Sequence, residues 1–346
     1  MKTIRILLAG LLFAVLGVSA GVGAAAAGAH GDANHGYLVW TRITSAGDTG
    51  QLVISDPDGR HVRQFTHPPT GAFDIDARIS PNGRWILFER DLPDTAAAGL
   101  IRVDGTGERL LDLHCTDPCV GTNTPSWTPD GQHILYDRVS GPFDSDGNAA
   151  SASLWKSDLY GGRQVRFSDP ALDPTTEETD PTFTPDGHVI VLRGLRDLRT
   201  AVWRLNSDGT HPHQLTPYSI NADLPQASPA RFGPSKGLVV FETFGHGVPD
   251  DATEGPSIAT VPANCGSIAS CTGQIHYLTS RSALPVQNFN PAWSPDGRQV
   301  IFVHAEFDLD QGIGDIYRIS VHGGRQIPIS TDPRFEFRPA WGAIGR

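Results

Sequence analysis

The chain has few positive charges and no familiar catalytic motif. Its 346 residues include 27 lysines and arginines against 38 acidic residues, which gives a formal net charge of −11. We expect no nucleic-acid partner, because binding to phosphates requires a basic surface. The sequence contains no His-Glu-x-x-His zinc motif, no P-loop and no dinucleotide-binding glycine pattern. No residue is therefore assigned a catalytic role from a motif.

Long apolar runs are also scarce, and the one at the N-terminus indicates export. Two basic residues precede an apolar stretch at 6–18, and a run of small residues follows at 21–29. This order is typical of a secretory signal peptide. The alternative is a retained membrane anchor, but the apolar core is shorter than the ~20 residues of a spanning helix. We predict a signal at 1–29 and an exported, monomeric domain at 30–346, secreted or held in the periplasm or cell envelope without an integral membrane segment.

Proline and glycine, by contrast, are abundant and recur in a fixed phrase. The chain has 27 prolines and 38 glycines. A phrase close to Ser-Pro-Asp-Gly returns roughly every 50 residues, followed by an apolar run such as Ile86-Leu87-Phe88. Proline and Asp-Gly favour a tight reversal, so each phrase predicts a hairpin. The five copies lie at 79–83, 127–131, 183–187, 232–237 and 293–297.

A second hairpin follows in every repeat. Its turn is rich in glycine, as in Gly323-Gly324, which joins a strand at 315–319 to a strand at 325–329. Four short antiparallel strands per repeat make one blade of a β-propeller. The apolar runs favour this fold, since a strand that neighbouring blades cover on both faces is apolar throughout. The alternative is a β-sandwich with regular turns, which gives no reason for the repeat.

The two chain ends carry the missing halves of one more repeat. Six second hairpins are present, but only five complete first hairpins. Arg338-Pro339-Ala340-Trp341 copies the first strand of a repeat, and Tyr37-Leu38-Val39-Trp40 copies the second. Pairing these segments would close the ring and remove open sheet edges. The predicted fold is all-β: a six-bladed β-propeller of four-stranded antiparallel blades, closed by the C-terminal first strand and the N-terminal second, third and fourth strands.

The repeat is similar to that of a known family. Its best copy runs from Pro291-Ala292-Trp293-Ser294-Pro295-Asp296-Gly297 through Val300-Ile301-Phe302 and Asp315-Ile316-Tyr317 to Gly323-Gly324. This copy resembles the WD40-like repeat of TolB-type β-propellers, and the resemblance covers residues 35–346. It implies the fold and says little about activity. TolB also carries an α/β domain before its propeller, which we expect this chain to lack.

Four cysteines form two close pairs. Cys115 and Cys119 fall in a connection between blades, and Cys265 and Cys271 fall in a long turn within a blade. The two kinds of connection lie on opposite faces of a propeller, so we predict the local disulfides Cys115–Cys119 and Cys265–Cys271. Export favours disulfides over metal binding. A zinc site would require all four cysteines to converge.

The residue before the first strand of each repeat should face the mouth of the central channel. Such a ring would combine carboxylate, amide and guanidinium groups and could hold a small polar ligand or the end of a peptide. The alternative is a ring of hydrated polar groups in an ordinary channel. The predicted members are Asp76, Thr124, Asp180, Pro229, Asn290 and Arg338.

Two acidic loops are candidate Ca²⁺ sites. Both place oxygen donors close together, as Ca²⁺-binding loops do, although Ala149 and Trp155 stand where an EF-hand needs Gly and Glu. The alternative for each is a solvated loop. The candidate ligands are Asp144, Asp146 and Asn148 in the first loop, and Glu306, Asp308, Asp310 and Asp315 in the second.

Two classes of function remain open. The first is an exported, non-enzymatic binding module that uses its long acidic loops to hold a protein, a peptide or a cell-wall component. The alternative is a carbohydrate-active enzyme, a lyase that performs metal-assisted proton abstraction on the same propeller. The enzyme would need two or more histidines and a carboxylate at the channel mouth. The candidate set is His35, His67 or His246 beside Asp180.

Overall fold

Nearly every described residue lies in or between short strands. The computed structural model of the chain describes residues 36–141, 151–168, 176–195, 197–244, 255–280, 286–308 and 311–343, apart from the side chains at 176, 307, 308 and 311–313. These residues form 24 strands, the short helix α1 (Ile268–Thr272) and the 3₁₀ turn η2 (Tyr218–Ile220). None of their helices has the length and apolar character needed to cross a membrane.

Four of the five sheets have four antiparallel strands each. Within each sheet the strands follow one another in chain order, so every sheet is built from two successive hairpins. The strands are β8 (Cys119–Trp127), β9 (His133–Ser140), β10 (Ser151–Asp158) and β11 (Val165–Arg166); β12 (Thr176–Phe183), β13 (Val189–Leu195), β14 (Thr200–Leu205) and β15 (His213–Gln214); β16 (Ala222–Ala227), β17 (Leu238–Thr243), β18 (Ser257–Pro262) and β19 (His276–Tyr277); and β20 (Val286–Trp293), β21 (Gln299–Asp308), β22 (Gln311–Ser320) and β23 (Ile327–Pro328).

The fifth sheet has eight strands and is mixed, which differs from the antiparallel blades that we predicted. It contains two four-stranded antiparallel groups joined by one parallel pair, Gly50 with Phe73. Gly50 allows this approach, because a Cβ there would lie 2.6 Å from the Phe73 ring. The strands are β24 (Glu336–Ala343), β1 (Gly36–Ile43), β2 (Gly50–Ser55) and β3 (Arg63–Gln64) in one group, and β4 (Phe73–Ile79), β5 (Trp85–Leu92), β6 (Thr95–Arg102) and β7 (Arg109–Leu110) in the other.

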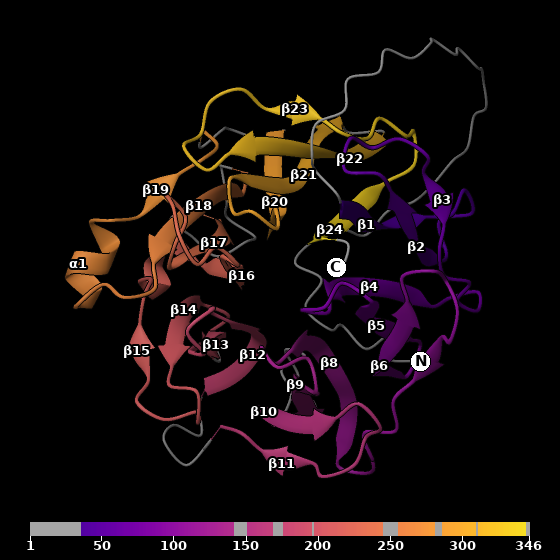
Figure 1. Ribbon diagram of the computed structural model, residues 1–346, viewed down its shortest axis with the longest axis horizontal. Helices are drawn as coiled ribbons and strands as arrows, with labels where there is room; N and C mark the ends of the chain where they lie inside the picture. Colours follow the sequence, from indigo (N-terminus) through magenta and orange to yellow (C-terminus); the bar gives the residue numbers. More distant parts are fainter. Residues whose placement is uncertain are drawn as a thin grey trace.

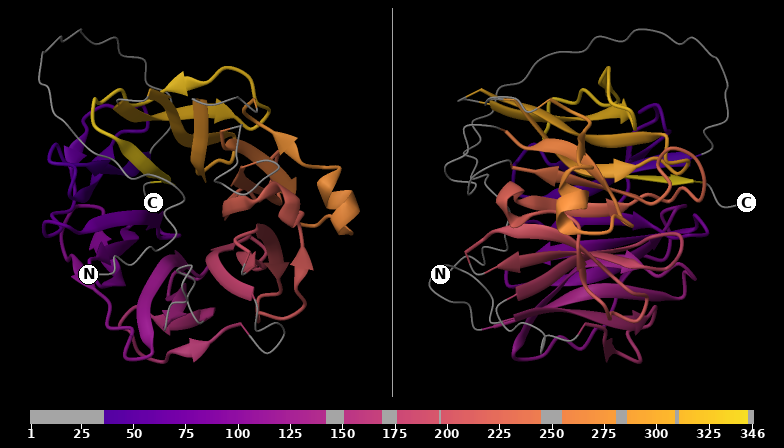
Figure 2. Two further views of the ribbon diagram at one scale, coloured as in Figure 1. Left: turned by 180° about the vertical axis from the view of Figure 1, so that it is seen from behind. Right: turned by 90° about the vertical axis from the view of Figure 1, so that its left-hand side faces the viewer.

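The four-stranded groups stand around a common centre (Figure 1). Each group is called a unit below and is named by the strand nearest to that centre: β4, β8, β12, β16, β20 or β24. Each of these inner strands contacts the next one around the circle. The view from behind in Figure 2 shows the same circle, with the C-terminal strand in yellow beside the first strands in indigo.

Strand β1 pairs with strands from both ends of the described chain. It pairs with β2 on one side and with β24 on the other, where Leu38 lies opposite Trp341. The indole nitrogen of Trp40 also donates a hydrogen bond of 2.7 Å to Glu336 Oε1. The two half-repeats recognised in the sequence therefore lie in one sheet.

The recurring phrase forms the turn between the first two strands of a unit. In one copy the Thr128 hydroxyl donates a hydrogen bond of 2.6 Å to Asp130 Oδ1, and the Gln132 N–H donates to the same oxygen. Gly131 then adopts a φ of +65°, which glycine tolerates without strain. The hydroxyl, the carboxylate and the glycine of the phrase thus hold the reversal together.

Adjacent units pack face to face through the second strand of each. Ile86, Leu87 and Phe88 in β5 are all fully buried. Ile86 and Phe88 pack into a core shared with β1 and β2, whereas Leu87 packs on the other face against Ile134 and other residues of the β8 unit. Successive side chains of a strand point to opposite faces, so a strand between two units is apolar at every position.

Both predicted disulfides are present. The Cα atoms are 5.1 Å apart in Cys115–Cys119 and 5.2 Å apart in Cys265–Cys271, and no free cysteine exists among the described residues. These separations are ordinary for disulfides.

Candidate functional site

Every inner strand contains a bulge at an equivalent position. The pairing register between the inner strand and its neighbour shifts there, and one residue has a φ between 43° and 53°. In five of the six strands that residue precedes a proline, which supplies no N–H to the ladder. The six residues are Asp76, Thr124, Asp180, Leu224, Asn290 and Arg338, and they are called the bulge ring below.

The ring lies halfway along the inner strands. The sequence predicted that its members stand just before the first strand of each repeat, and the strand bounds place them inside that strand instead. Strand β4 begins at Phe73, three residues before Asp76, and β24 begins at Glu336, two residues before Arg338. The bulge breaks the alternation of side chains, so the half of the strand that precedes it does not read as a strand in the sequence.

One predicted member is also wrong. The structure places Leu224, and not Pro229, in the ring, and Pro229 is exposed in the turn that follows β16. The phrase at 232–237 is not the start of the turn in this unit. The turn begins earlier, at Ser228-Pro229. The segment Leu224-Pro225 carries the same X-Pro signal as the other copies. The ring therefore has five polar members and one apolar member.

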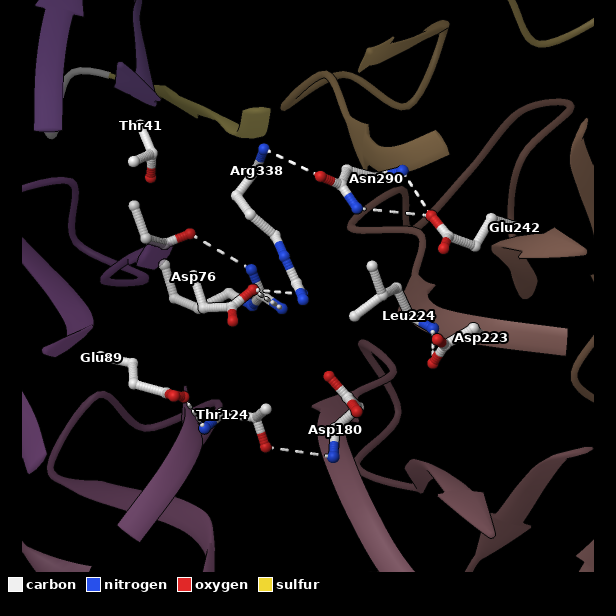
Figure 3. A network of polar contacts seen from close by, with 12 residues as sticks. Thr41, Asp76, Glu89, Thr124, Asp180, Asp223, Leu224, Glu242, Asn290 and Arg338 are labelled. Atoms are coloured by element: carbon white, nitrogen blue, oxygen red, sulfur yellow. Dashed lines mark hydrogen bonds and ion pairs between the residues drawn. The ribbon is translucent and has the colours of Figure 1, made fainter. Parts of the chain in front are cut away.

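Side chains of one unit bond the backbone of the next around the ring (Figure 3). The Thr124 N–H donates to Glu89 Oε2 at 2.6 Å, and the Asp180 N–H donates to Thr124 Oγ1 at 3.1 Å. The same kind of bond joins the Asn290 N–H to Glu242 Oε2 and the Arg338 N–H to Asn290 Oδ1. The bulges leave these N–H groups outside the sheet ladder, and carboxylate or polar oxygens from the neighbouring unit satisfy them.

Three carboxylates that the sequence did not single out form hydrogen bonds with members of the ring. Glu89, Asp137 and Glu242 come from the second strands of three units and are almost fully buried. Each follows an aromatic residue at the end of an apolar run, in the pairs Phe88-Glu89, Tyr136-Asp137 and Phe241-Glu242. The sequence did contain a signal for these residues, because each is an acid placed at the end of an apolar run that is expected to be buried.

A buried ion pair recurs in three of the units, two residues before the ring position on the inner strand. An arginine of the second strand pairs there with a carboxylate of the inner strand at 2.6 Å, and both side chains are largely buried. The pairs are Arg42–Glu336, Arg90–Asp74 and Arg193–Glu178. These three carboxylates are each paired with an arginine, so the acids in and beside the ring are the better candidates for binding a ligand.

The side chain of Arg338 extends toward the acids in and beside the bulge ring. Its Nη1 lies 2.9 Å from Asp76 Oδ1, and Figure 3 shows the side chain extending between Asp76 and Asp180. Burial alone would lower the pKa of Arg338, but Asp76, Asp180 and Glu242 raise it above the usual arginine value. The guanidinium therefore stays charged and compensates part of the negative charge.

Several of the acids bind protons near neutral pH. Burial is the main cause, and it raises the pKa of Asp137 to about 8 and those of Asp180, Asp223 and Glu242 to about 7. Neighbouring carboxylates add to the effect, since Asp223 raises the pKa of Asp180. A cation placed among these groups would favour their ionised forms.

A small cavity opens beside the ring. It is partly open to solvent, and Asp76, Asn290 and Arg338 contribute to its wall. Asp180 Oδ1 is buried nearby and has no hydrogen-bond partner in the described part of the chain, and Figure 3 shows its carboxylate pointing toward the ring centre. The rest of the cavity wall is formed by Arg78, Leu224, Gln226, Pro291 and Pro339.

The predicted Ca²⁺ loops fall largely outside the described residues. Asp144, Asp146, Asn148 and Asp310 lie outside them, and the side chain of Asp308 is not described. Glu306 is exposed, with its carboxylate 4.0 Å from His304 Nε2. Burial raises the pKa of Asp315 in β22 to about 6. Ca²⁺ binding in either loop stays a prediction.

The histidines expected for a lyase are placed only in part. His35 and His246 lie outside the described residues, and His67 is exposed in the connection from β3 to β4. His304 instead pairs through Nδ1 with Asn288 at 2.8 Å. The charges that act on Asp180 include those of the acids Asp223 and Asp76 and of the arginines Arg338 and Arg78.

Comparison with known proteins identifies the fold. No family model matches the chain. The Tol-Pal system protein TolB of Pelagibacter ubique (strain HTCC1062) is 32% identical over 83 residues, which is 24% of this chain and 16% of that protein. TolB from Acinetobacter baumannii superposes with a TM-score of 0.63 at 17% identity, over 89% of this chain and 67% of the other. The chain has the fold of a TolB-type β-propeller.

Other solved structures share parts of this TolB-type propeller. The putative TolB from Agrobacterium tumefaciens gives a TM-score of 0.56 at 17% identity, over 90% of this chain and 91% of the other. The hydrazine synthase of Kuenenia stuttgartiensis gives 0.64 at 14% identity, over 90% of this chain and 47% of the other. One fold thus accompanies different functions, and the chemistry of this propeller has to be argued from its own residues.

Proposed function

We propose that this TolB-type propeller is an exported, non-enzymatic binding module of the cell envelope. Its acidic loops would attract a protein, peptide or cell-wall partner, and the bulge ring would hold a cationic group of that partner. The charge balance near the ring supports this role. Seven described carboxyl groups act on one another there, and Arg78 or Arg338 compensates only some of them; the acids are Asp76, Glu89, Asp91, Asp137, Asp180, Asp223 and Glu242.

The buried carboxylate of Asp180 carries the proposal. Its Oδ1 has no hydrogen-bond partner among the described residues, and the side of the ring formed by Asp180, Asp223 and Glu242 has no ion pair like that of Asp76 with Arg338. A buried, unpaired acceptor is costly, and an ammonium or guanidinium donor would satisfy it. This argument favours a partner that presents an amine or an arginine.

A closed ring of six blades is part of the same proposal. Four sheets of four strands and one sheet of two such units add up to six units, and β24 pairs with β1. Closure would bring Arg338 and Asp76, 262 residues apart, into one central cluster. The binding role requires that all six bulges face the same space.

The test is capture of partners from an exported envelope fraction by wild type and by Asp180→Asn. The control is Asp208→Asn, which removes an exposed carboxylate whose bonds are to Thr210 in an outer turn. We expect at least one partner that wild type and the control retain, that D180N loses, and that elutes at high salt. If D180N retained every partner as well as wild type does, the ring would not be the binding site.

The alternative function is a carbohydrate lyase, and one observation favours it. The pKa of Asp137 at about 8 suits a group that transfers protons near neutral pH. The test is incubation with a polyuronate and Mn²⁺, with ultraviolet detection of the unsaturated product. Activity that wild type has and Asp137→Asn lacks would support the enzyme, and inactive wild type would remove the alternative.

A further inference from the structure

A second cluster of chemically active side chains lies at the outer edge of the β16 unit. The connection from β18 to β19 is long and contains the helix α1. Cys265 precedes this helix and Cys271 lies in it, and both are buried, with 7% and 0% of their surface exposed. The other disulfide is less protected, because Cys115 is partly exposed.

His213 of the neighbouring β12 unit faces this disulfide. Its Nε2 lies 2.9 Å from the carbonyl oxygen of Cys265 and 4.0 Å from Cys271 Sγ. One histidine nitrogen and the two sulfurs lie within 4.8 Å of one another. Among the described residues, this is the one group of three or more His, Cys, Asp or Glu residues whose ligand atoms converge in this way.

We propose that Cys265, Cys271 and His213 form a redox-controlled site for Zn²⁺ or a similarly thiophilic ion. With the disulfide closed, the sulfurs cannot bind the ion as thiolates. A dithiol reductant would transfer two electrons and two protons to the disulfide and would itself become a disulfide. The two thiols would then release two protons as they bind the ion. A disulfide oxidant that accepts two electrons from the thiolates and becomes a dithiol would close the bond again and expel the ion.

The geometry suits tetrahedral coordination. Zinc binds thiolate sulfur at about 2.3 Å and imidazole nitrogen at about 2.0 Å. Two sulfurs on one tetrahedral ion are then about 3.8 Å apart, compared with about 2 Å in a disulfide. His213 would move its ring proton to Nδ1, so that the lone pair of Nε2 faces the ion. The fourth position would be left for water or a ligand.

The surroundings suit a neutral complex. Two thiolates balance the charge of a divalent ion, and the imidazole adds none. The cysteines pack in an apolar core with Leu215, Ile220 and Ala263. Such a core penalises an isolated charge but tolerates a neutral cluster. Because His213 comes from the β12 unit, a bound ion would cross-link two units.

The test uses Co²⁺ as the probe on the exported chain with Cys115→Ser and Cys119→Ser, which leaves one disulfide. The protein is reduced with a phosphine, desalted without oxygen, checked by circular dichroism and titrated. We expect one Co²⁺ per reduced chain with the absorption of a tetrahedral thiolate complex, displacement by Zn²⁺, and no such signal from the oxidised chain.

Matched histidine variants identify the third ligand. His213→Ala should weaken binding by about tenfold or more, whereas His211→Ala should not, since His211 is exposed and contacts Asn206 and Thr210. The proposal is wrong if the reduced chain gives no thiolate signal, if H213A binds as tightly as its parent, or if reduction unfolds the protein and metal does not restore it.

Discussion

Arg338 Nη1 lies 2.9 Å from Asp76 Oδ1, and the two side chains are 16% and 3% exposed. One residue comes from the last strand and the other from the inner strand of the next unit. This ion pair joins the two units at the centre of the ring. It also supplies one of the two arginine charges that act on the buried acids there.

The first prediction concerns the loss of that charge. Arg338→Met keeps much of the side-chain volume but leaves Asp76 and its neighbours uncompensated. Breaking a buried pair by removing one partner costs about 3–5 kcal/mol, and we expect a loss of this size in the free energy of unfolding at pH 8, measured by urea denaturation. Arg298→Ala is the control, because Arg298 is exposed and 4.0 Å from Asp296. Equal effects of the two variants would contradict the central role of Arg338.

The second prediction is that stability falls as pH rises. The pKa of Asp137 goes from 3.8 to about 8 on folding, and those of Asp180 and Asp223 go from 3.8 to about 7. Between about pH 4 and pH 8 the unfolded chain therefore releases protons that the folded chain keeps, and folding loses free energy as pH rises. We expect a lower free energy of unfolding at pH 8 than at pH 5.

Asp137→Asn tests the source of this dependence. The amide mimics the protonated acid, so the folded and unfolded variant should differ by up to one bound proton less than the wild type. The fall of the free energy of unfolding with pH should then become less steep, by at most about 1.4 kcal/mol per pH unit. Asp208→Asn should leave the slope unchanged. A stability that increased from pH 5 to pH 8 in the wild type would show that the buried acids are ionised.

The third prediction concerns the order in which the disulfides open. Attack on a disulfide needs access to a sulfur, and Cys265 and Cys271 are buried, whereas Cys115 is partly exposed. In mild reductant at neutral pH, alkylation followed by peptide mapping should label Cys115 and Cys119 first. Labelling of Cys271 before Cys115 would mean that the helix α1 region opens more readily than its burial indicates.

The fourth prediction tests the pairing of the chain ends. Trp341 is 7% exposed and packs with Ile301 and Val303 of the β20 unit, and it lies opposite Leu38 across the β24–β1 pair. Trp341→Ala should lower the free energy of unfolding by about 3–5 kcal/mol. Trp85→Ala should cost less, because Trp85 is only partly buried. Thermal unfolding of both variants makes the comparison.

Much of the fold could be predicted from the sequence because the turns repeat. Proline, an acid or amide, and glycine act locally, so each copy of the phrase marks a hairpin without reference to the rest of the chain. The predicted ring residue of the β16 unit was wrong because the turn of this unit is longer than the others. The predicted position, Pro229, lies five residues after the true one, Leu224. The parallel pair of Gly50 with Phe73 depends on how two units approach, which no local pattern records.

The candidate site was harder to predict. Asp76, Asp180 and Arg338 could be placed near one another because they occupy equivalent positions in the repeat. Their depth in the strand could not, since a proline after the residue is as compatible with the first position of a strand as with a bulge inside it. Contacts between units, such as His213 with Cys265, join residues that are far apart in the sequence. No local sequence pattern indicates that such residues meet.

The boundary between the β12 and β16 units differs from the others at the ring. The Leu224 N–H is satisfied by Asp223 of its own strand, at 2.8 Å. Three other polar bonds join these two units, from the Thr200 hydroxyl to the Ala222 carbonyl, from Arg204 to the Ala263 carbonyl and from His213 to the Cys265 carbonyl. Two of these three bonds end on the connection that contains α1, so a change in that connection would weaken the contact between the two units at a distance from the bulge ring.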